Sequence, residues 1–305
     1  MYTPRRVSRS EFIPLRGLDH HVRIWGELSP GRPPIVMLHG WMDVGASFQF
    51  VVDALASERP VIAPDWRGFG LTDARGTDNF WFPDYLADLD GLLDHYLPDQ
   101  AVDIVGHSMG GNVSMFYAGA RPQRVRRMVN LEGFGMPQTR PEQAPARYAR
   151  WMDELKQWKR GELDLQTYPE PGGVARRLMR TNPRLSKDKA DWLASHWAGP
   201  TTRADGSTGW GILGDAAHKI VNANLYRVDE AIEIYKNITA PVLAVDAVDG
   251  IVKTWKSRGI DEDMLARLHA VPGLTRLTLQ DAGHMLHHDQ PGQVAAVIEA
   301  HLNGP

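Results

Sequence analysis

The chain has 305 residues, 43% of them apolar, and a formal net charge of −3, a globular composition that favours neither a nucleic-acid nor a membrane-surface partner. It contains no cysteine, which excludes disulfides, thiolate catalysis and cysteine metal sites. No apolar segment typical of a secretory signal and no run of about 18 apolar residues is present, so we expect a soluble, cytoplasmic protein.

Short runs of apolar and β-branched residues predict eight strands, at residues 11–17, 21–28, 34–40, 60–68, 101–108, 127–133, 241–247 and 275–284. The first two runs alternate apolar and polar residues, which favours an antiparallel edge hairpin. Most of the later runs are almost continuously apolar, as in strands buried on both faces of a parallel sheet. Helical patterns lie between them at about 46–57, 83–96, 109–120, 261–269 and 291–302. The alternation predicts an α/β fold with a doubly wound, eight-stranded, mostly parallel sheet.

One long segment, residues 134–237, interrupts this alternation. It shows no convincing strand pattern and reads as helices and loops. Because structureless loops of this length are uncommon, we expect a helical cap subdomain there, with residues 1–133 and 238–305 forming the core domain. The segment holds five of the ten tryptophans, so we expect at least one indole ring to face a substrate pocket. These are Trp151, Trp158, Trp192, Trp197 and Trp210.

The stretch DIVGHSMGGN, residues 103–112, places Ser108 among glycines between a predicted strand and a predicted helix. Serine is a favoured helix N-cap, which gives a purely structural alternative. The G-x-S-x-G pattern is also that of a nucleophile elbow, in which a sharp turn exposes the serine hydroxyl.

Polar residues follow most of the predicted parallel strands, where the carboxyl ends of such strands form ligand sites. In chain order they are His39, Trp41, Asp65, Arg67, Ser108, Glu132, Asp246, Asp249, Asp281 and His284. We interpret Asp65 and Arg67 as a structural pair around a turn. The remaining set contains a serine, acids and a histidine in the chain order of an α/β-hydrolase.

Four stretches carry a resemblance to the α/β-hydrolase fold superfamily, of the capped, serine esterase- or lipase-like kind. They are MLHGWM (37–42), DWRGFGLTD (65–73), VGHSMGGNVSMFYA (105–118) and DAGHMLHHDQP (281–291). The resemblance implies that Ser108 is the nucleophile and that the N–H groups of Met109 and Trp41 form the oxyanion hole. It also implies that His284 is the general base, with His287 and His288 as competitors.

The acid that would orient His284 has two candidates. In the family's usual pattern after the seventh strand, the aspartate position here holds Gly250, and Asp249 lies one residue early. Glu132 ends the sixth strand, from which some α/β-hydrolases take the acid. Because a carboxylate at the end of an apolar strand is costly to bury without a partner, we favour Glu132 over Asp249.

These residues predict a serine hydrolase that cleaves a small-molecule ester with an apolar group through an acyl-enzyme. We expect Trp41 and His107 to contact substrate and His39 to order the oxyanion loop. We expect no cofactor and no metal site, because no histidine–carboxylate cluster stands at ligand spacing on one element. We also expect a monomer or homodimer.

Three alternatives stay open: a cofactor-free perhydrolase, a carbon–carbon bond hydrolase with the same residues, and a ligand receptor on this fold. Haloalkane dehalogenases and epoxide hydrolases of this fold use an aspartate nucleophile, so Ser108 argues against both.

Overall fold

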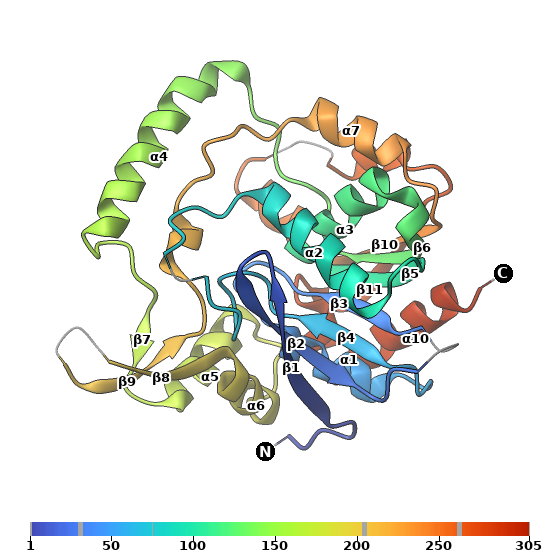
Figure 1. Cartoon of the computed structure of the whole chain (residues 1–305), viewed down its shortest axis with the longest axis horizontal. Helices are drawn as coiled ribbons and strands as arrows, with labels where there is room; N and C mark the ends of the chain where they lie inside the picture. Colours follow the sequence, from blue (N-terminus) through green and yellow to red (C-terminus); the bar gives the residue numbers. More distant parts are fainter. Residues whose placement is uncertain (1, 30–32, 75, 203–205, 261–263, 305) are drawn as a thin grey trace.

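The computed structural model describes residues 2–29, 33–74, 76–202, 206–260 and 264–304. Its main feature is an eight-stranded sheet in the order β1-β2-β4-β3-β5-β6-β10-β11, seen in Figure 1. The strands are β1 (Ser8–Leu15), β2 (Leu18–Trp25), β3 (Ile35–Leu38), β4 (Val61–Pro64), β5 (Val102–His107), β6 (Val125–Leu131), β10 (Val242–Asp249) and β11 (Thr275–Gly283). Each falls on one of the eight predicted runs, with ends that differ by a few residues.

The pairing follows the predicted division between edge and centre. β2 pairs antiparallel with both β1 and β4, and every other neighbouring pair is parallel. β3, β4 and β5 are buried along their whole length, which explains the continuously apolar sequences of β3 and β4. The fold class predicted from the sequence is therefore confirmed.

Helices cover both faces of this sheet, as Figure 1 shows. Apolar side chains of α2 (Phe82–Tyr96), α3 (Met109–Ala120) and α7 (Val228–Lys236) form one core with the sheet. Those of α1 (Gln49–Ala54), α9 (Leu286–Asp289) and α10 (Pro291–Leu302) form a second core on the opposite face. Such three-layer packing buries apolar surface on both sides of the strands.

Short helical elements complete this part of the chain. They are η1 (Gly45–Phe48), η2 (Pro122–Arg124), α8 (Ile251–Ser257) and η5 (Met264–Ala270). The predicted helix at 261–269 begins in residues 261–263, which lie outside the described residues, and its remainder is η5.

The segment between β6 and β10 differs from the prediction because it contains strands. Its elements are η3 (Pro141–Gln143), α4 (Ala144–Lys159), β7 (Thr167–Tyr168), α5 (Pro171–Thr181), α6 (Lys187–Trp197), β8 (Ala198–Thr202), β9 (Thr208–Ile212), η4 (Ala216–Lys219) and α7. β7, β9 and β8 form a small antiparallel sheet. The prediction of helices and loops alone was wrong, because strands of two to five residues with glycine, proline and threonine carry no apolar run for a pattern to detect.

The parts of this segment differ in how closely they pack against the rest of the molecule. α5, α6 and the small sheet enclose a third apolar cluster that also includes Val44, Ala46 and Phe50 from the region after β3. α4 stands away from the main sheet in Figure 1 and has no buried residue. α7 instead packs against α3 in the sheet layer, so the domain boundary at residue 237 stays a prediction.

No helix in the described ranges combines the length and the apolar character that crossing a bilayer requires.

Candidate active site

Ser108 occupies the sharp turn between β5 and α3, with backbone angles φ 50° and ψ −113°. Non-glycine residues rarely adopt such angles, and surrounding contacts must hold them there. The Ser108 N–H donates to the carbonyl of Leu131 at 2.8 Å, and the N–H of Asn112 donates to the Ser108 carbonyl at 3.0 Å. The Ser108 side chain makes no helix-capping hydrogen bond, so the N-cap alternative does not account for this serine.

Gly110 explains how the turn fits against its neighbours. A Cβ atom at this position would lie 2.1 Å from the carbonyl oxygen of Leu38 in β3. Only glycine allows α3 to begin this close to the neighbouring strand. The loop after β3 is equally close to the turn, because a Cβ on Gly40 would lie 3.2 Å from Cβ of Ser108.

His284 follows β11 directly and lies between Ser108 and Glu132. Its Nε2 is 3.0 Å from Oγ of Ser108, and its Nδ1 is 3.2 Å from Oε2 of Glu132. The tautomer that satisfies both contacts has Nδ1–H donating to the carboxylate and Nε2 accepting from the hydroxyl. Three side chains from the ends of β5, β6 and β11 thus form one hydrogen-bonded row, although they are up to 176 residues apart in sequence.

Glu132 is a fully buried carboxylate whose oxygens accept two backbone hydrogen bonds besides the contact with His284. The Ala247 N–H donates to Oε1 at 2.8 Å and the Ile251 N–H donates to Oε2 at 2.5 Å. A Cβ on Gly250 would lie 2.3 Å from Oε1. The carboxylate therefore fills the space that a side chain at position 250 would need, and these partners offset the cost of burying its charge.

Asp249, the other candidate acid, lies elsewhere. Its carboxylate is paired with Arg184 at 2.5 Å and with Lys253 at 2.6 Å, at the surface. Hydrogen bonds from Lys253 and Arg184 hold the pKa of Asp249 below its ordinary value. The β10–β11 register shifts between Ala247 and Asp249, so the position of Asp249 departs from the regular alternation of the strand.

The two expected oxyanion donors flank Ser108. Met109 is the first residue of α3, where a helix leaves its N–H without an intrahelical acceptor. Trp41 lies in the loop beside Ser108, with an indole that is 54% exposed. Neither N–H donates a hydrogen bond to another described residue.

His39 holds this loop in place and does not contact Ser108. It is completely buried; its Nδ1–H donates to the Gly40 carbonyl at 2.8 Å and its Nε2 accepts from the Trp66 N–H at 2.9 Å. Burial lowers the pKa of His39, which suits a neutral ring that accepts a hydrogen bond.

His107, His287 and His288 are all buried and none of them occupies the position beside the hydroxyl. The expectation that His107 contacts substrate does not match its place, because its Nε2–H donates to the His284 carbonyl at 2.8 Å from beneath the loop. Burial, together with His287 and His284, lowers the pKa of His107 well below its ordinary value.

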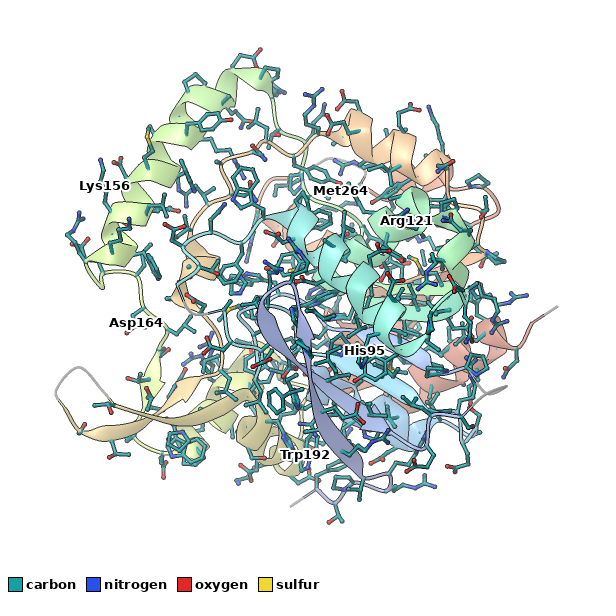
Figure 2. All side chains as sticks on the ribbon, viewed as in Figure 1. His95, Arg121, Lys156, Asp164, Trp192 and Met264 are labelled. Atoms are coloured by element: carbon teal, nitrogen blue, oxygen red, sulfur yellow. The ribbon has the colours of Figure 1, made fainter. Side chains whose placement is uncertain are left out.

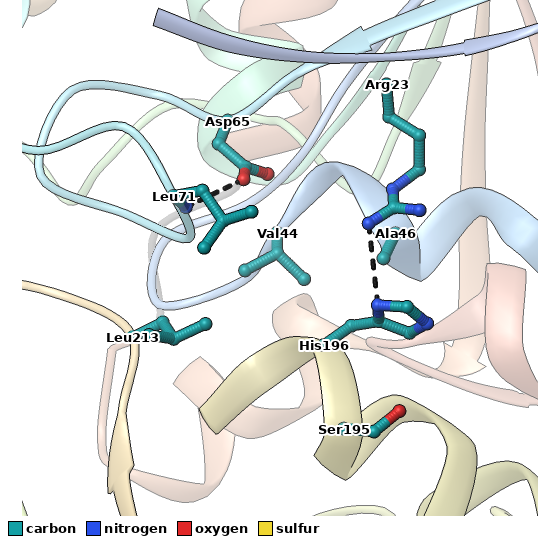
Figure 3. Close-up of a pocket in the computed structure, with 8 residues that line it drawn as sticks. All are labelled: Arg23, Val44, Ala46, Asp65, Leu71, Ser195, His196 and Leu213. Carbon is teal, nitrogen blue, oxygen red and sulfur yellow. Dashed lines mark hydrogen bonds between the residues drawn. The ribbon is translucent and has the colours of Figure 1, made fainter. Parts of the chain in front are cut away.

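A separate small cavity of about 60 Å³ lies between the loop after β3 and α6. Figure 3 shows its lining residues, including Arg23 with a hydrogen bond of 3.4 Å to His196. Its lining contains neither Ser108 nor His284, and a space of this size accommodates only a few water molecules.

Comparison with known proteins identifies the family of the chain. The sequence pattern of the alpha/beta hydrolase fold matches residues 33–291, which is most of the chain. The chain belongs to the α/β-hydrolase fold family. Within that family it is similar to a serine hydrolase-like protein of Danio rerio, with 27% identity over 97% of this chain and 89% of the relative.

Other members are similar over shorter stretches or in structure. A 2-hydroxy-6-oxo-2,4-heptadienoate hydrolase of Pseudomonas putida is 37% identical over 34% of this chain and 38% of its own length. Among solved α/β-hydrolase structures, the thioesterase domain from the curacin biosynthetic pathway superposes with a TM-score of 0.81 and 25% identity, covering 96% and 99% of the two chains. The protein is thus a hydrolase of the α/β fold with serine hydrolase-like relatives.

Two features of the site were not predicted from the sequence. The backbone donors Ala247 and Ile251 that hold Glu132 leave no signal in residue types, although Gly250 at the usual aspartate position was a clue. Asp43, which lies buried near His107 and His287, was not singled out although it lies two residues after HGW in MLHGWMD.

Proposed function

We propose that this α/β-hydrolase is a serine esterase that cleaves a carboxylic ester through an acyl-enzyme. The observation that carries the proposal is the continuous row Ser108 Oγ, His284 Nε2, His284 Nδ1 and Glu132 Oε2, with contacts of 3.0 and 3.2 Å. This row has the order and spacing of a nucleophile, a base and an orienting acid.

The reaction begins as His284 Nε2 takes the hydroxyl proton of Ser108 while Oγ attacks the ester carbonyl carbon. The resulting imidazolium is stabilised by the Glu132 carboxylate, which does not itself need to accept the proton. The tetrahedral intermediate then collapses, the C–O bond to the alcohol breaks, and the proton on Nε2 passes to the leaving oxygen. A water molecule, deprotonated by His284, releases the acid by the reverse sequence.

The N–H groups of Met109 and Trp41 stabilise the negative oxygen of each intermediate in this proposal. Their support is the position of Met109 at the start of α3 and the contact of the Gly40 loop with Ser108. Removing one such donor typically costs about 2.7–4 kcal/mol in barrier height. The exposed Trp41 indole offers an apolar surface for the substrate.

Under the same proposal, this esterase acts in the cytoplasm on a small ester with an apolar group.

The test is hydrolysis of p-nitrophenyl acetate, butyrate and octanoate, followed by the release of nitrophenolate. The wild-type chain is expected to turn over many times, and Ser108→Ala is expected to lower kcat by about 10⁶-fold. A single stoichiometric burst, or a Ser108→Ala variant as active as wild type, would overturn the proposal. Thermal stability measured in parallel shows that the variant is folded.

A carbon–carbon bond hydrolase is the second candidate, favoured by the local similarity to the Pseudomonas putida enzyme. The same three side chains would serve it. The comparison is the turnover of 2-hydroxy-6-oxo-2,4-heptadienoate against that of the p-nitrophenyl esters: a kcat/KM at least tenfold higher for the dienoate would favour this candidate over the esterase.

A further inference from the structure

A buried group of metal-binding side chains lies beneath the row of Ser108, His284 and Glu132, and the proposed reaction does not use it. Asp43 comes from the loop after β3, His107 from the end of β5 and His287 from α9. All three are at least 97% buried, and their candidate ligand atoms all lie within 4.8 Å of one another. Nε2 of His287 is 3.8 Å from Oδ2 of Asp43.

Four polar side-chain atoms of this group are buried and have no hydrogen-bond partner among the described residues. They are Oδ2 of Asp43, Nδ1 of His107 and both ring nitrogens of His287. Leaving a polar atom buried and unpaired is unfavourable for a neutral group and more so for a charged one. Three such side chains converging on one point are therefore costly unless something binds between them.

The opposite atoms of two of these side chains are held by the protein. The Nε2–H of His107 donates to the His284 carbonyl at 2.8 Å, which leaves a lone pair on Nδ1. Oδ1 of Asp43 accepts from Trp197 Nε1–H at 2.8 Å and from the Ser47 hydroxyl, which leaves Oδ2 free to bind. Metal ligands in proteins are typically oriented in this way by a hydrogen bond to their other polar atom.

We propose that Asp43, His107 and His287 bind one divalent transition-metal ion, with Zn²⁺ as the ion that their chemistry fits best. Two imidazoles and one carboxylate are a usual set of three protein ligands for zinc. Two atoms bound to one Zn²⁺ at about 2.0–2.2 Å lie roughly 3.3 Å apart. Nε2 of His287 and Oδ2 of Asp43, now 3.8 Å apart, must therefore move about 0.5 Å closer to bind the same ion. A water molecule or another group would be the fourth ligand of the ion.

Such an ion would connect the three loops that carry the reacting groups. His107 immediately precedes Ser108, His287 lies three residues after His284, and Asp43 lies two residues after Trp41. The inference goes beyond the proposed esterase and does not depend on it, because the ion would stabilise the loops without touching a substrate.

The test measures metal content in the full chain, produced without a polyhistidine tag in zinc-supplemented medium and freed of loose metal by gel filtration. Elemental mass spectrometry is expected to find about one Zn²⁺ per chain in wild type and in Ser108→Ala. Asp43→Asn and His287→Leu are expected to hold at least tenfold less. The matched control His95→Gln removes an exposed histidine of α2, labelled in Figure 2, and is expected to bind like wild type.

A second variant keeps the inference testable if Asp43→Asn or His287→Leu fails to fold. Trp197→Phe keeps an aromatic ring but removes the hydrogen bond to Asp43, and is expected to weaken Zn²⁺ binding about 10–100-fold in competition with a chelator. Chain produced with Co²⁺ is expected to show visible d–d absorption, and chelation is expected to lower the Tm of wild type. Wild type with under a tenth of an equivalent of Zn²⁺ and a Tm insensitive to chelator, or ligand variants that bind like wild type, would overturn the inference.

Discussion

The role of single residues is clearest at Glu132. The carboxylate touches His284 at 3.2 Å and is held by two backbone N–H groups, so its position is set by β10 and the start of α8 and not by its own side-chain freedom. Asp249 lies two residues before Ile251, and its carboxylate is instead paired with Arg184 and Lys253.

Exchanging each candidate acid for its amide separates the two. Glu132→Gln is expected to lower kcat for p-nitrophenyl butyrate by about 10³–10⁴-fold, because the amide neither orients nor stabilises the His284 imidazolium. Asp249→Asn serves as the matched control and is expected to stay within about threefold of wild type, as loss of a surface ion pair has little effect. The opposite ranking in steady-state kinetics would assign the acid to Asp249.

Gly250 provides a second residue-level prediction. Gly250→Ala places a methyl group 2.3 Å from Glu132 Oε1, so the carboxylate must move and kcat is expected to fall by about 10²-fold. Gly292→Ala is the control, because a Cβ there meets no atom within 4 Å. Adding Gly250→Asp to Glu132→Ala is expected to raise kcat about tenfold above that of Glu132→Ala alone, because the new side chain supplies a carboxylate in the same space. Unchanged kcat in Gly250→Ala would contradict the close packing.

At the level of elements, side chains after the strands hold the loops that form the site. Asp65, which follows β4, accepts from the Gly45 N–H at 2.7 Å and the Leu71 N–H at 3.0 Å, and contacts His21 Nδ1 of β2 at 2.7 Å. Arg67 is bonded instead to Asp88 of α2. Both residues are structural, as interpreted from the sequence, but each belongs to its own network and they do not form a pair.

Asp65 is therefore expected to contribute strongly to stability. Burial raises the pKa of Asp65, but the hydrogen bond and charge of His21 outweigh this and leave the pKa lowered. Asp65→Asn leaves partners on three segments without a carboxylate and is expected to lower the free energy of unfolding by about 3 kcal/mol. Asp153→Asn, an exposed carboxylate on α4, is expected to cost under about 1 kcal/mol. Equal urea midpoints for the two variants would refute this role.

Across the whole molecule, several partly or fully buried histidines are neutral in the folded chain, and this links stability to pH. His218 is stacked between Phe69 and Phe80 with ring centroids 3.7 Å away on each side. Burial lowers the pKa of His218 to about 3, and burial together with the charge of Arg23 lowers the pKa of His196 to about 4. These values lie below the ordinary 6.5, so the unfolded chain binds protons that the folded chain does not.

The sign of the effect follows from this difference. Each such histidine stabilises the fold fully above pH 6.5, and this contribution is lost as the pH falls towards the folded pKa, by about 1.4 kcal/mol per pH unit. His218→Gln is expected to reduce the slope of unfolding free energy against pH between pH 6 and 4 by about that amount. The exposed His95→Gln is the control. Identical slopes in urea titrations of wild type and His218→Gln would contradict the account.

The main sheet was predictable from the sequence, whereas the small sheet and the buried group around Asp43 were not. Strands buried in a parallel sheet have nearly continuous apolar sequences. The strands of the sheet, and the polar residues that follow them, could therefore be predicted from sequence patterns. The short strands β8 and β9 could not, because their pairing with each other and not their composition defines them. The group of Asp43, His107 and His287 was not predictable because its members come from three separate segments, namely the loop after β3, the end of β5 and α9, whereas a sequence signal for a metal site is ligand spacing along one element.

The proposed reaction requires that the Ser108 hydroxyl, 3.0 Å from His284 Nε2, is an activated nucleophile. The most direct measurement is labelling with a fluorophosphonate, read by mass spectrometry of the intact chain and of its peptides. We expect one adduct per chain, located on Ser108, absent in Ser108→Ala and formed at least about 10³-fold more slowly in His284→Ala. A folded wild-type chain that gains no adduct, or equal labelling of Ser108→Ala, would contradict it.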